Sequence, residues 1–174
     1  MEEIAERAGV TRGPLYHYFD SKRDLFAAVY EEVEQALAAE IASEIRTRTA
    51  SESDAWQQVY VASQAFLDVS LHPAVQRIAL LEAPTVLGWD ARRDIARYGL
   101  ALIRRGLQNA IDQRVIEPQP VEPLAHILRA ALSEGALFIA RAEDQAAARA
   151  EVGAAIERLL DGLRRRRKPA AHSV

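Results

Sequence analysis

The sequence predicts an all-α fold. Apolar residues recur at steps of three and four along most of the chain, as on one face of a helix, and no stretch alternates convincingly like a half-buried strand. Alanine and leucine dominate the apolar residues, while strand-favouring residues are few. The 174 residues suffice for a buried core, either as one domain or as a small module joined to a larger one.

The first half of the chain predicts five helices. Two short ones cover residues 4–8 and 11–19. A long third helix begins at Ser21 and ends near Arg46, about 40 Å at 1.5 Å per residue. A fourth covers about 54–71, after a polar break, and Pro73 opens the fifth. The third helix is expected to pack inward through Leu25, Phe26, Val29, Val33, Leu37 and Ile41.

The second half predicts three long helices. Pro84 and Gly88 bracket an irregular link, after which a helix covers 90–113. A proline-rich connector leads to the last two helices, at about 121–142 and 144–167. Residues 168–174 are expected to form a disordered tail.

Composition narrows the functional classes. Without cysteine the chain has no disulfide, thiolate nucleophile or sulfur-ligated metal, which suits a cytoplasmic protein. We expect no metal and no cofactor, and no apolar run approaches the roughly 20 residues of a membrane span. The formal net charge is −3, so any binding to nucleic acid must come from a local surface.

Residues 4–25 carry the most informative pattern, two short helices around a tight turn. Gly9 permits the positive φ that ends the first helix, Val10 plugs the turn and Thr11 caps the second. Leu15, Tyr18 and Phe19 are expected to pack inward at helical spacing. This is the pattern of a helix-turn-helix, which places the start of its second helix in the major groove of DNA.

The second helix offers DNA-binding chemistry on its other face. Arg12 can donate two hydrogen bonds to guanine, and Tyr16 and His17 can reach phosphates or base edges. Lys22 stands at the start of the long helix, where the helix dipole and free N–H groups already favour a phosphate.

This run of residues resembles the signature of the TetR/AcrR regulators, I-A-x-x-A-G-V-[ST]-x-G-x-L-Y-x-[HY]-F-x-[SN]-K-x-x-L. The resemblance covers about the first 30 residues and implies a bacterial one-component repressor, a homodimer that a small effector releases from double-stranded operator DNA. It divides the chain into a reading module (1–30, continuing into the long helix to about 48) and an effector-binding and dimerisation body (49–167). The implied DNA contacts are Thr11, Arg12, Gly13, Tyr16, His17 and Lys22.

The sequence departs from the family pattern in one respect, because the family's module has a further helix before the position of Ile4. Losing that cover would expose several hundred Å² of apolar surface, a cost of several kcal/mol at about 25 cal/mol per Å². The interpretation is a start codon set too far downstream or a shortened chain. As given, the chain is expected to bind DNA weakly or not at all.

The body predicts an effector pocket and a dimer interface. The small effector is expected to be apolar or amphipathic. The residues expected in its pocket are aromatic or can form hydrogen bonds: Tyr60, Gln64, Phe66, Trp89, Tyr98, His126 and Phe138. The last two helices have wide apolar faces that suit a four-helix dimer interface, although the same faces could pack within one chain. The predicted interface residues are Leu128, Ala131, Leu132, Gly135, Ile156, Leu159, Leu160 and Leu163.

Two other classes of function stay open. A helical enzyme would need a catalytic motif, but the sequence has no nucleophile elbow, phosphate-binding glycine loop or H-E-x-x-H. A ligand-binding and dimerisation protein that no longer binds DNA is the second alternative. An in-frame amphipathic helix upstream of Met1 would favour the regulator.

Overall fold

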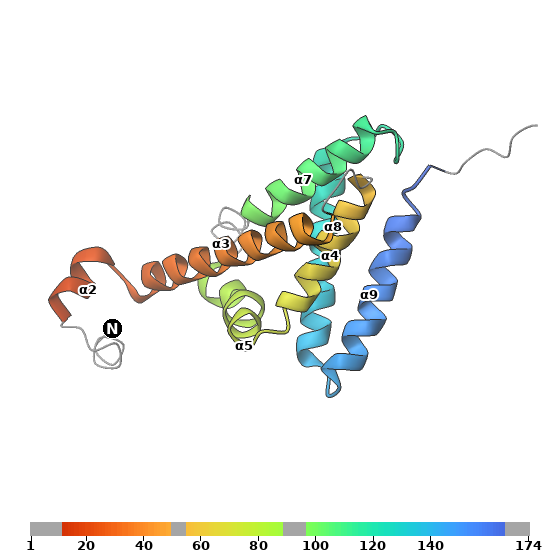
Figure 1. The fold of residues 1–174 in the computed structure, drawn as a ribbon. Helices are drawn as coiled ribbons and strands as arrows, with labels where there is room; N and C mark the ends of the chain where they lie inside the picture. Colours follow the sequence, from red (N-terminus) through yellow and green to blue (C-terminus); the bar gives the residue numbers. More distant parts are fainter. Residues whose placement is uncertain (1–11, 50–54, 89–96, 166–174) are drawn as a thin grey trace, which may run out of the picture.

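The computed structural model describes residues 12–49, 55–88 and 97–165, and it consists of helices packed on one another (Figure 1). Within these ranges no strand forms, and the nearest approach to one is an isolated antiparallel bridge between Ile116 and Arg164. The prediction of an all-α fold is confirmed. The helix expected at 4–8, the tail expected at 168–174 and the start of the helix expected at 90–113 lie outside the described residues.

The N-terminal elements are helix α2 (Arg12–Tyr18) and the long helix α3 (Lys22–Arg48). Ser21 is the N-cap of α3, since its Oγ accepts a hydrogen bond from the backbone N–H of Asp24 at 3.1 Å. The predicted start of the long helix is therefore confirmed. Figure 1 shows α2 at the far end of α3, beyond the helices that pack around the rest of α3.

Helix α3 buries a slightly different face from the one the sequence predicts. Tyr30, Leu37 and Ile41 are its buried residues, whereas Val29 is 37% exposed. The prediction for Val29 is wrong, because the neighbouring Tyr30 turns toward the body and is only 2% exposed. Tyr30 is the first buried residue along α3 and marks where the helix enters the body.

The middle of the chain folds into α4 (Ala55–Val69) and α5 (Pro73–Val75), with Pro73 in the first turn of α5 as predicted. The helix then widens to a π-helix, η1 (Gln76–Glu82), and residues 83–88 continue as helix. The irregular link predicted from Pro84 onward is wrong in this part. The wider π turns come just before Pro84, whose ring lacks an N–H and clashes with the carbonyl four residues earlier in a regular α-helix. Gly88 has a φ of +74°, a conformation that favours glycine.

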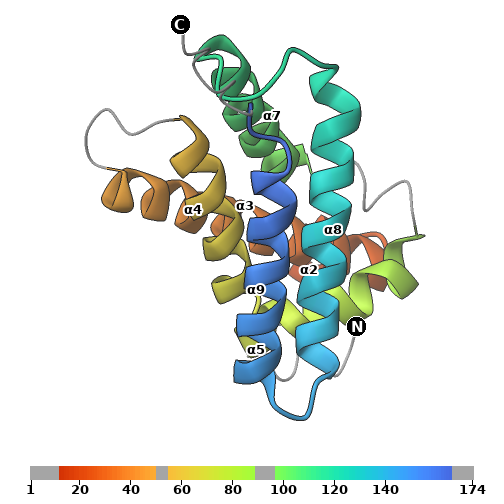
Figure 2. The same cartoon turned by 90° about the vertical axis from the view of Figure 1, so that its right-hand side faces the viewer.

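The C-terminal half contains α7 (Arg97–Asp112), α8 (Val121–Arg141) and α9 (Gln145–Asp161). Asp144 caps α9, with its Oδ1 accepting from the N–H of Ala147 at 2.9 Å. Figure 2 shows α8 and α9 side by side on one face of the molecule. By length and composition α8 could also cross a membrane, but it packs against α4, α7, α9 and η1 and contributes five buried residues to the fold.

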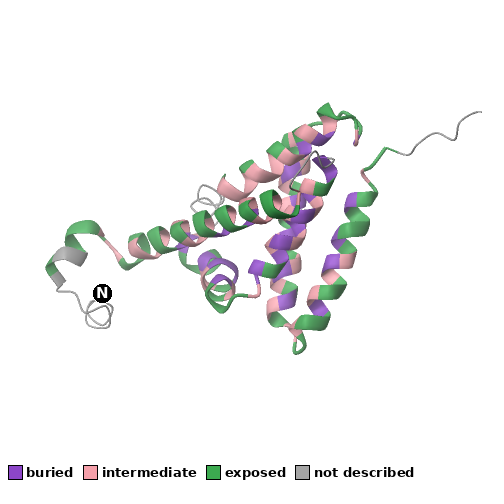
Figure 3. Cartoon of the chain, in the orientation of Figure 1, coloured by how far each residue is buried: buried purple, intermediate pink, exposed green. Residues whose placement is uncertain are grey.

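The described residues form two hydrophobic cores. Figure 3 shows that the buried residues lie along the packed helices, whereas α2 is exposed where it is described. The larger core joins α4, α7, α8 and α9 and includes Leu67, Leu107 and Leu160. The smaller core joins α3 to α4, α5, η1 and residues 83–88, and includes Tyr30 and Ile41. Helix α4 contributes to both cores, which explains why it is buried on nearly every side.

Candidate functional site

The exposed end of the molecule is formed by α2 and the first turn of α3. Gly13, His17 and Lys22 are exposed, and the Tyr16 side chain is 51% exposed. Tyr18, predicted to pack inward, is instead 77% exposed, and its ring meets the His17 ring edge to face at 5.4 Å between centroids. Thr11 and the side chain of Arg12 lie outside the described residues.

The start of α3 combines a positive charge with free backbone donors. Lys22 is the first residue of the helix, directly after the Ser21 cap. The N–H groups of a first helical turn attract an anion, and a lysine beside them adds to that attraction. Arg23 fixes this turn to the body by donating from Nη2 to the carbonyl oxygen of Leu87 at 2.8 Å. The surface can therefore meet a phosphate while it is anchored to the body.

A cavity of about 580 Å³ lies between the two hydrophobic cores. Its wall comes from α3, α4, α5, η1, α7 and α8. This volume is within the range of about 300–1,000 Å³ that is typical of small-molecule sites. The buried floor is mainly aliphatic, with two serines, and consists of Tyr30, Leu37, Ile41, Val59, Ser63, Ser70, Val75, Ala79, Leu80, Leu128 and Leu132.

The polar residues of the cavity are concentrated toward its rim. Arg46 and Arg105 are exposed, and Arg129 is half-buried. Glu34 is the one carboxylate in the lining, which contains no histidine. Among the described residues no group of three His, Cys, Asp or Glu side chains gathers to hold a metal ion. The arrangement suits binding of a molecule with a large apolar part and a smaller polar part.

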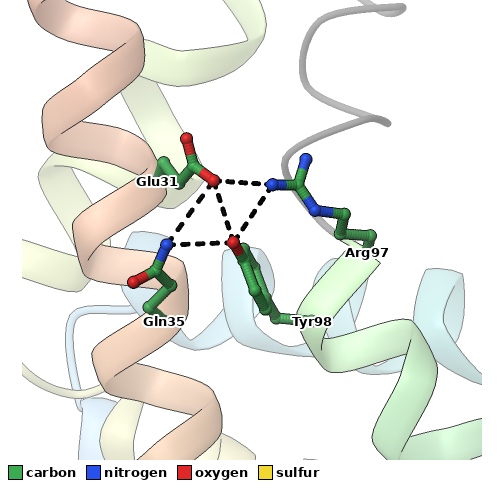
Figure 4. Close-up of polar contacts among 4 residues, drawn as sticks. All are labelled: Glu31, Gln35, Arg97 and Tyr98. Atoms are coloured by element: carbon green, nitrogen blue, oxygen red, sulfur yellow. Dashed lines mark hydrogen bonds and ion pairs between the residues drawn. The ribbon is translucent and has the colours of Figure 1, made fainter.

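A cluster of four polar side chains joins α3 to α7 (Figure 4). Glu31 Oε1 accepts hydrogen bonds from Arg97 Nη2 at 2.7 Å and from the Tyr98 hydroxyl at 2.9 Å. The Tyr98 oxygen accepts from Gln35 Nε2 at 2.9 Å and from Arg97 Nη2 at 3.0 Å. The hydrogen bond to Tyr98, with a smaller effect of the Glu31 charge, raises the pKa of Arg97 from its ordinary value. We call this cluster the α3–α7 latch.

Removing the tyrosine hydroxyl is expected to weaken the latch. The Tyr98→Phe variant keeps the ring beneath the Arg97 guanidinium but loses three hydrogen bonds. We expect a loss of about 1 kcal/mol in the free energy of unfolding, measured by urea denaturation. Tyr60→Phe is the matched control, since the Tyr60 hydroxyl makes no hydrogen bond to a described residue. An equal loss in both variants would contradict the role of the latch.

The comparison with known families decides the family of this chain. A family model described as "Tetracyclin repressor-like, C-terminal domain" matches residues 56–163. The chain belongs to the tetracycline-repressor (TetR) family. A second model, "Bacterial regulatory proteins, tetR family", matches residues 1–29 of this TetR-family chain.

Individual relatives agree with this placement. The crystal structure of a TetR-family transcriptional regulator from Pectobacterium atrosepticum is similar with a TM-score of 0.83 and 33% identity, over 97% of this chain and 84% of that one. The HTH-type transcriptional regulator YfiR of Bacillus subtilis is 31% identical over 74% of this chain and 62% of its own length. The HTH-type transcriptional activator FasR of Mycolicibacterium smegmatis is 38% identical over 41% of this chain and 31% of its own length. The chain thus spans less than two thirds of these two curated relatives.

The structure places only part of the predicted pocket set of this TetR-family chain around the cavity. Phe66 lines the cavity, and Trp89 lies outside the described residues. The other five do not line this cavity: Tyr60, Gln64, Tyr98, His126 and Phe138.

Four of the predicted side chains that do not line the cavity have other partners or face outward. Gln64 Nε2 donates to the carbonyl oxygen of Gly153 in α9 at 3.1 Å, and Tyr98 belongs to the α3–α7 latch. His126 Nε2 lies 3.2 Å from Glu122 Oε1. Arg104 lowers the pKa of the Glu122 carboxyl, and His126 lowers it by a smaller amount. Phe138 is 58% exposed on the outside of α8. Aromatic character alone therefore does not locate the cavity.

The residues that sequence reasoning missed come mostly from α3 and α7. Tyr30, Ile45, Leu102 and Ile103 line the cavity, and so do the three rim arginines. The face of α3 was predicted as core, but nothing in its spacing separates a residue that touches a neighbour from one that faces a space between two cores. The available signal was an arginine without a nearby opposite charge, beside a stripe of apolar residues on the same helix.

The predicted dimer residues divide into two groups. Leu128, Leu132, Ile156 and Leu160 are at most 7% exposed within one chain, so the prediction that they form an intermolecular face is wrong. Gly135 also serves contact within the chain, because a Cβ there would lie 2.7 Å from Val152 Cγ1 of α9. Of the remaining predicted residues, Ala131 and Leu163 are half-buried and Leu159 is 61% exposed.

Proposed function

We propose that this chain acts as a one-component transcriptional regulator, most simply a repressor. In this proposal α2 reads double-stranded operator DNA, a small effector occupies the cavity, and a second copy of the chain pairs through α8 and α9. Family membership and the names of the relatives support a regulatory role.

One observation carries the proposal: α3 belongs to both candidate sites. Its first turn holds Lys22 beside the exposed α2, and its later turns line the cavity from Tyr30 to Thr49. A ligand in the cavity therefore touches the same helix that positions the reading end. The effect of a ligand can therefore reach the DNA-binding end through α3 alone.

The expected mechanism is a change in the direction of α3. Two reading heads of a dimer grip successive major grooves when they lie about 34–36 Å apart, so a shift of a few ångströms breaks this spacing. The effector acts only if it binds the DNA-free arrangement more tightly than the DNA-bound one. The α3–α7 latch and the Arg23–Leu87 hydrogen bond hold α3 to two different parts of the body, which fits a helix with defined positions.

The exposed faces of α8 and α9 support a homodimer. Ile127, Phe138 and Leu159 are large apolar residues exposed by 66%, 58% and 61%. Ile127, Ala131, Glu134 and Phe138 follow one another at steps of four, three and four, which places them on one side of α8. Figure 2 shows α8 and α9 together on one face, where a second copy would form a four-helix bundle.

The cavity favours sensing over catalysis. Its lining contains one carboxylate, no histidine and no cysteine, so no acid–base pair faces the space. We accordingly assign the reading role to residues 1–30, continuing into α3, and sensing and dimerisation to residues 49–167, with α3 shared. Operator binding places the protein in the bacterial cytoplasm.

The reading end can be tested through the salt dependence of DNA binding. Because the chain as given is expected to bind DNA weakly, a duplex is first selected from random DNA with the chain at low salt. Its affinity is then measured by fluorescence anisotropy over a range of salt concentrations. Lys22→Ala is expected to weaken binding to all DNA sequences alike. It is also expected to reduce the slope of log K against log salt concentration by about one, since one phosphate contact is lost.

Arg114→Ala is the matched control for this measurement. Arg114 is exposed in the turn after α7, away from the reading end, and makes no ion pair with a described residue. An unchanged slope for Lys22→Ala, or an equal change for both variants, would contradict the assignment of α2 and the start of α3 to DNA.

A further inference from the structure

We propose that the cavity takes an amphipathic anion, with an aliphatic body against the buried floor and a carboxylate or phosphate head group held by Arg46, Arg105 and Arg129. This inference rests on the proposed function, because it names the chemical class of the effector. It follows from the composition of the floor, from the charge balance of the lining and from the positions of the arginines.

The floor of the cavity offers little to a polar ligand group. Its two buried hydroxyls already donate within α4, Ser63 Oγ to the carbonyl oxygen of Val59 at 2.8 Å and Ser70 Oγ to that of Phe66 at 2.6 Å. Tyr30 and Phe66 are the aromatic residues of the lining, and the rest of the apolar lining is aliphatic. Such a floor favours an aliphatic body, which gains free energy for each CH₂ group that it removes from water.

The charge balance of the lining favours an anion. Three arginines and one glutamate line the cavity. None of Arg46, Arg105 and Arg129 makes a hydrogen bond or ion pair with another described residue. Other arginines are paired, as Arg104 is with Glu122 at 3.1 Å and Arg149 with Asp68 at 2.7 Å. The excess positive charge at the cavity therefore lacks a counter-charge from the described protein.

Each of the three arginines has a neutral hydrogen-bonding side chain one helical turn further on, and these also line the cavity. The pairs are Arg46 and Thr49 at the C-terminal end of α3, Arg105 and Asn109 on α7, and Arg129 and Ser133 on α8. The Thr49 hydroxyl already donates to the carbonyl oxygen of Ile45, so the neutral donors left free among the described residues are Asn109 and Ser133. Residues three or four positions apart lie on the same face of a helix. The guanidinium group matches the geometry of carboxylate and phosphate oxygens, and nearby neutral donors complete their hydrogen bonding. Helices α7 and α8 thus each present a guanidinium group and a neutral donor to one space, and α3 adds a third guanidinium group.

The test varies the head group while it keeps the tail constant. Binding of decanoate, decyl phosphate, decanol and decyltrimethylammonium to the full chain is measured by calorimetry, at concentrations below micelle formation. We expect at least one of the two anions to bind about tenfold more tightly than decanol and than the cation, or better, as charge-assisted hydrogen bonds predict. The tighter of the two anions identifies the head group as carboxylate or phosphate.

Two triple variants with the same change in charge locate the effect. Arg46→Gln/Arg105→Gln/Arg129→Gln is expected to bind the anions no better than decanol while its affinity for decanol stays unchanged. Arg114→Gln/Arg141→Gln/Arg158→Gln replaces three exposed arginines that do not line the cavity, and it is expected to keep the preference for anions. Equal binding of decanol or of the cation by the wild-type chain, or an equal loss in both triple variants, overturns the inference.

The failure of the inference and that of the proposed function give different results. If decanol or the cation binds best and releases the selected duplex, the effector role stands and the anionic class is wrong. If an anion binds selectively through the three arginines but leaves DNA affinity unchanged, the class stands and the effector role is wrong. If no probe binds, both are wrong.

Discussion

Replacing Leu67 by alanine is expected to lower the free energy of unfolding by about 2–5 kcal/mol, the usual cost of a cavity at a buried leucine. Leu67 is 0% exposed at the centre of the larger core. Its Cδ2 lies 3.9 Å from where a Cβ of Gly135 would stand, so it packs on α8 at a position that has no side chain to fill the space left behind. The melting temperature is expected to fall by about 5–15 °C for a chain of this size.

Leu81→Ala is the control for this substitution, because Leu81 is 46% exposed. A surface change of this kind is expected to alter stability by at most about 0.5 kcal/mol. Both variants are compared with wild type by chemical and thermal denaturation at one protein concentration. Similar losses for Leu67→Ala and Leu81→Ala would contradict the core described above.

The double substitution Ile127→Glu/Phe138→Glu is expected to convert the proposed dimer to a monomer. It places two carboxylates in the middle of the face proposed to meet a second copy, and both side chains are now more than half exposed. Burying unpaired charges in an interface costs several kcal/mol, so the dissociation constant of the proposed dimer should rise by about 100-fold or more. Light scattering across a micromolar concentration series measures the change.

Leu81→Glu is the control for the interface. It introduces the same charge at an exposed leucine of η1, outside α8 and α9, and is expected to leave the dimer intact. The helix content of each variant is measured by circular dichroism, which separates loss of pairing from loss of fold. A wild-type chain that is monomeric at micromolar concentration, or a double variant that stays dimeric, would overturn the proposed face.

The course of most helices could be predicted because local signals decide it. Ser21 and Asp144 cap α3 and α9 through their own side chains, and the cap forms whatever the rest of the chain does. The proline-rich connector likewise fixes the start of α8 at Val121. Pro84 misled the prediction, since the helix continues through it after widening to the π-helix η1. That adjustment depends on how η1 packs against α3 and α8, which local sequence does not reveal.

The cavity and the dimer face could be predicted only in part, because both depend on how helices are placed relative to each other. Periodicity shows that Leu128 and Leu132 face an apolar environment, but it cannot distinguish a core of the same chain from a second copy. It also cannot show that the space between two cores remains open. Phe138 and Tyr98 were grouped with the pocket for their aromatic rings, yet one faces outward and the other joins two helices at the surface.

The double role of α3 restricts how such a sensor can diversify. Leu37 and Ile41 line the cavity and also pack α3 on the body, so a substitution there is expected to alter both the proposed ligand preference and the angle of the exposed end of α3. Arg129 and Ser133 line the cavity from α8, so substitutions there are expected to alter the cavity without changing α3. New ligand preferences should therefore arise first in the parts of the cavity wall that other helices form. Helix α3 should keep its sequence, because the proposed recognition of existing operators depends on its direction.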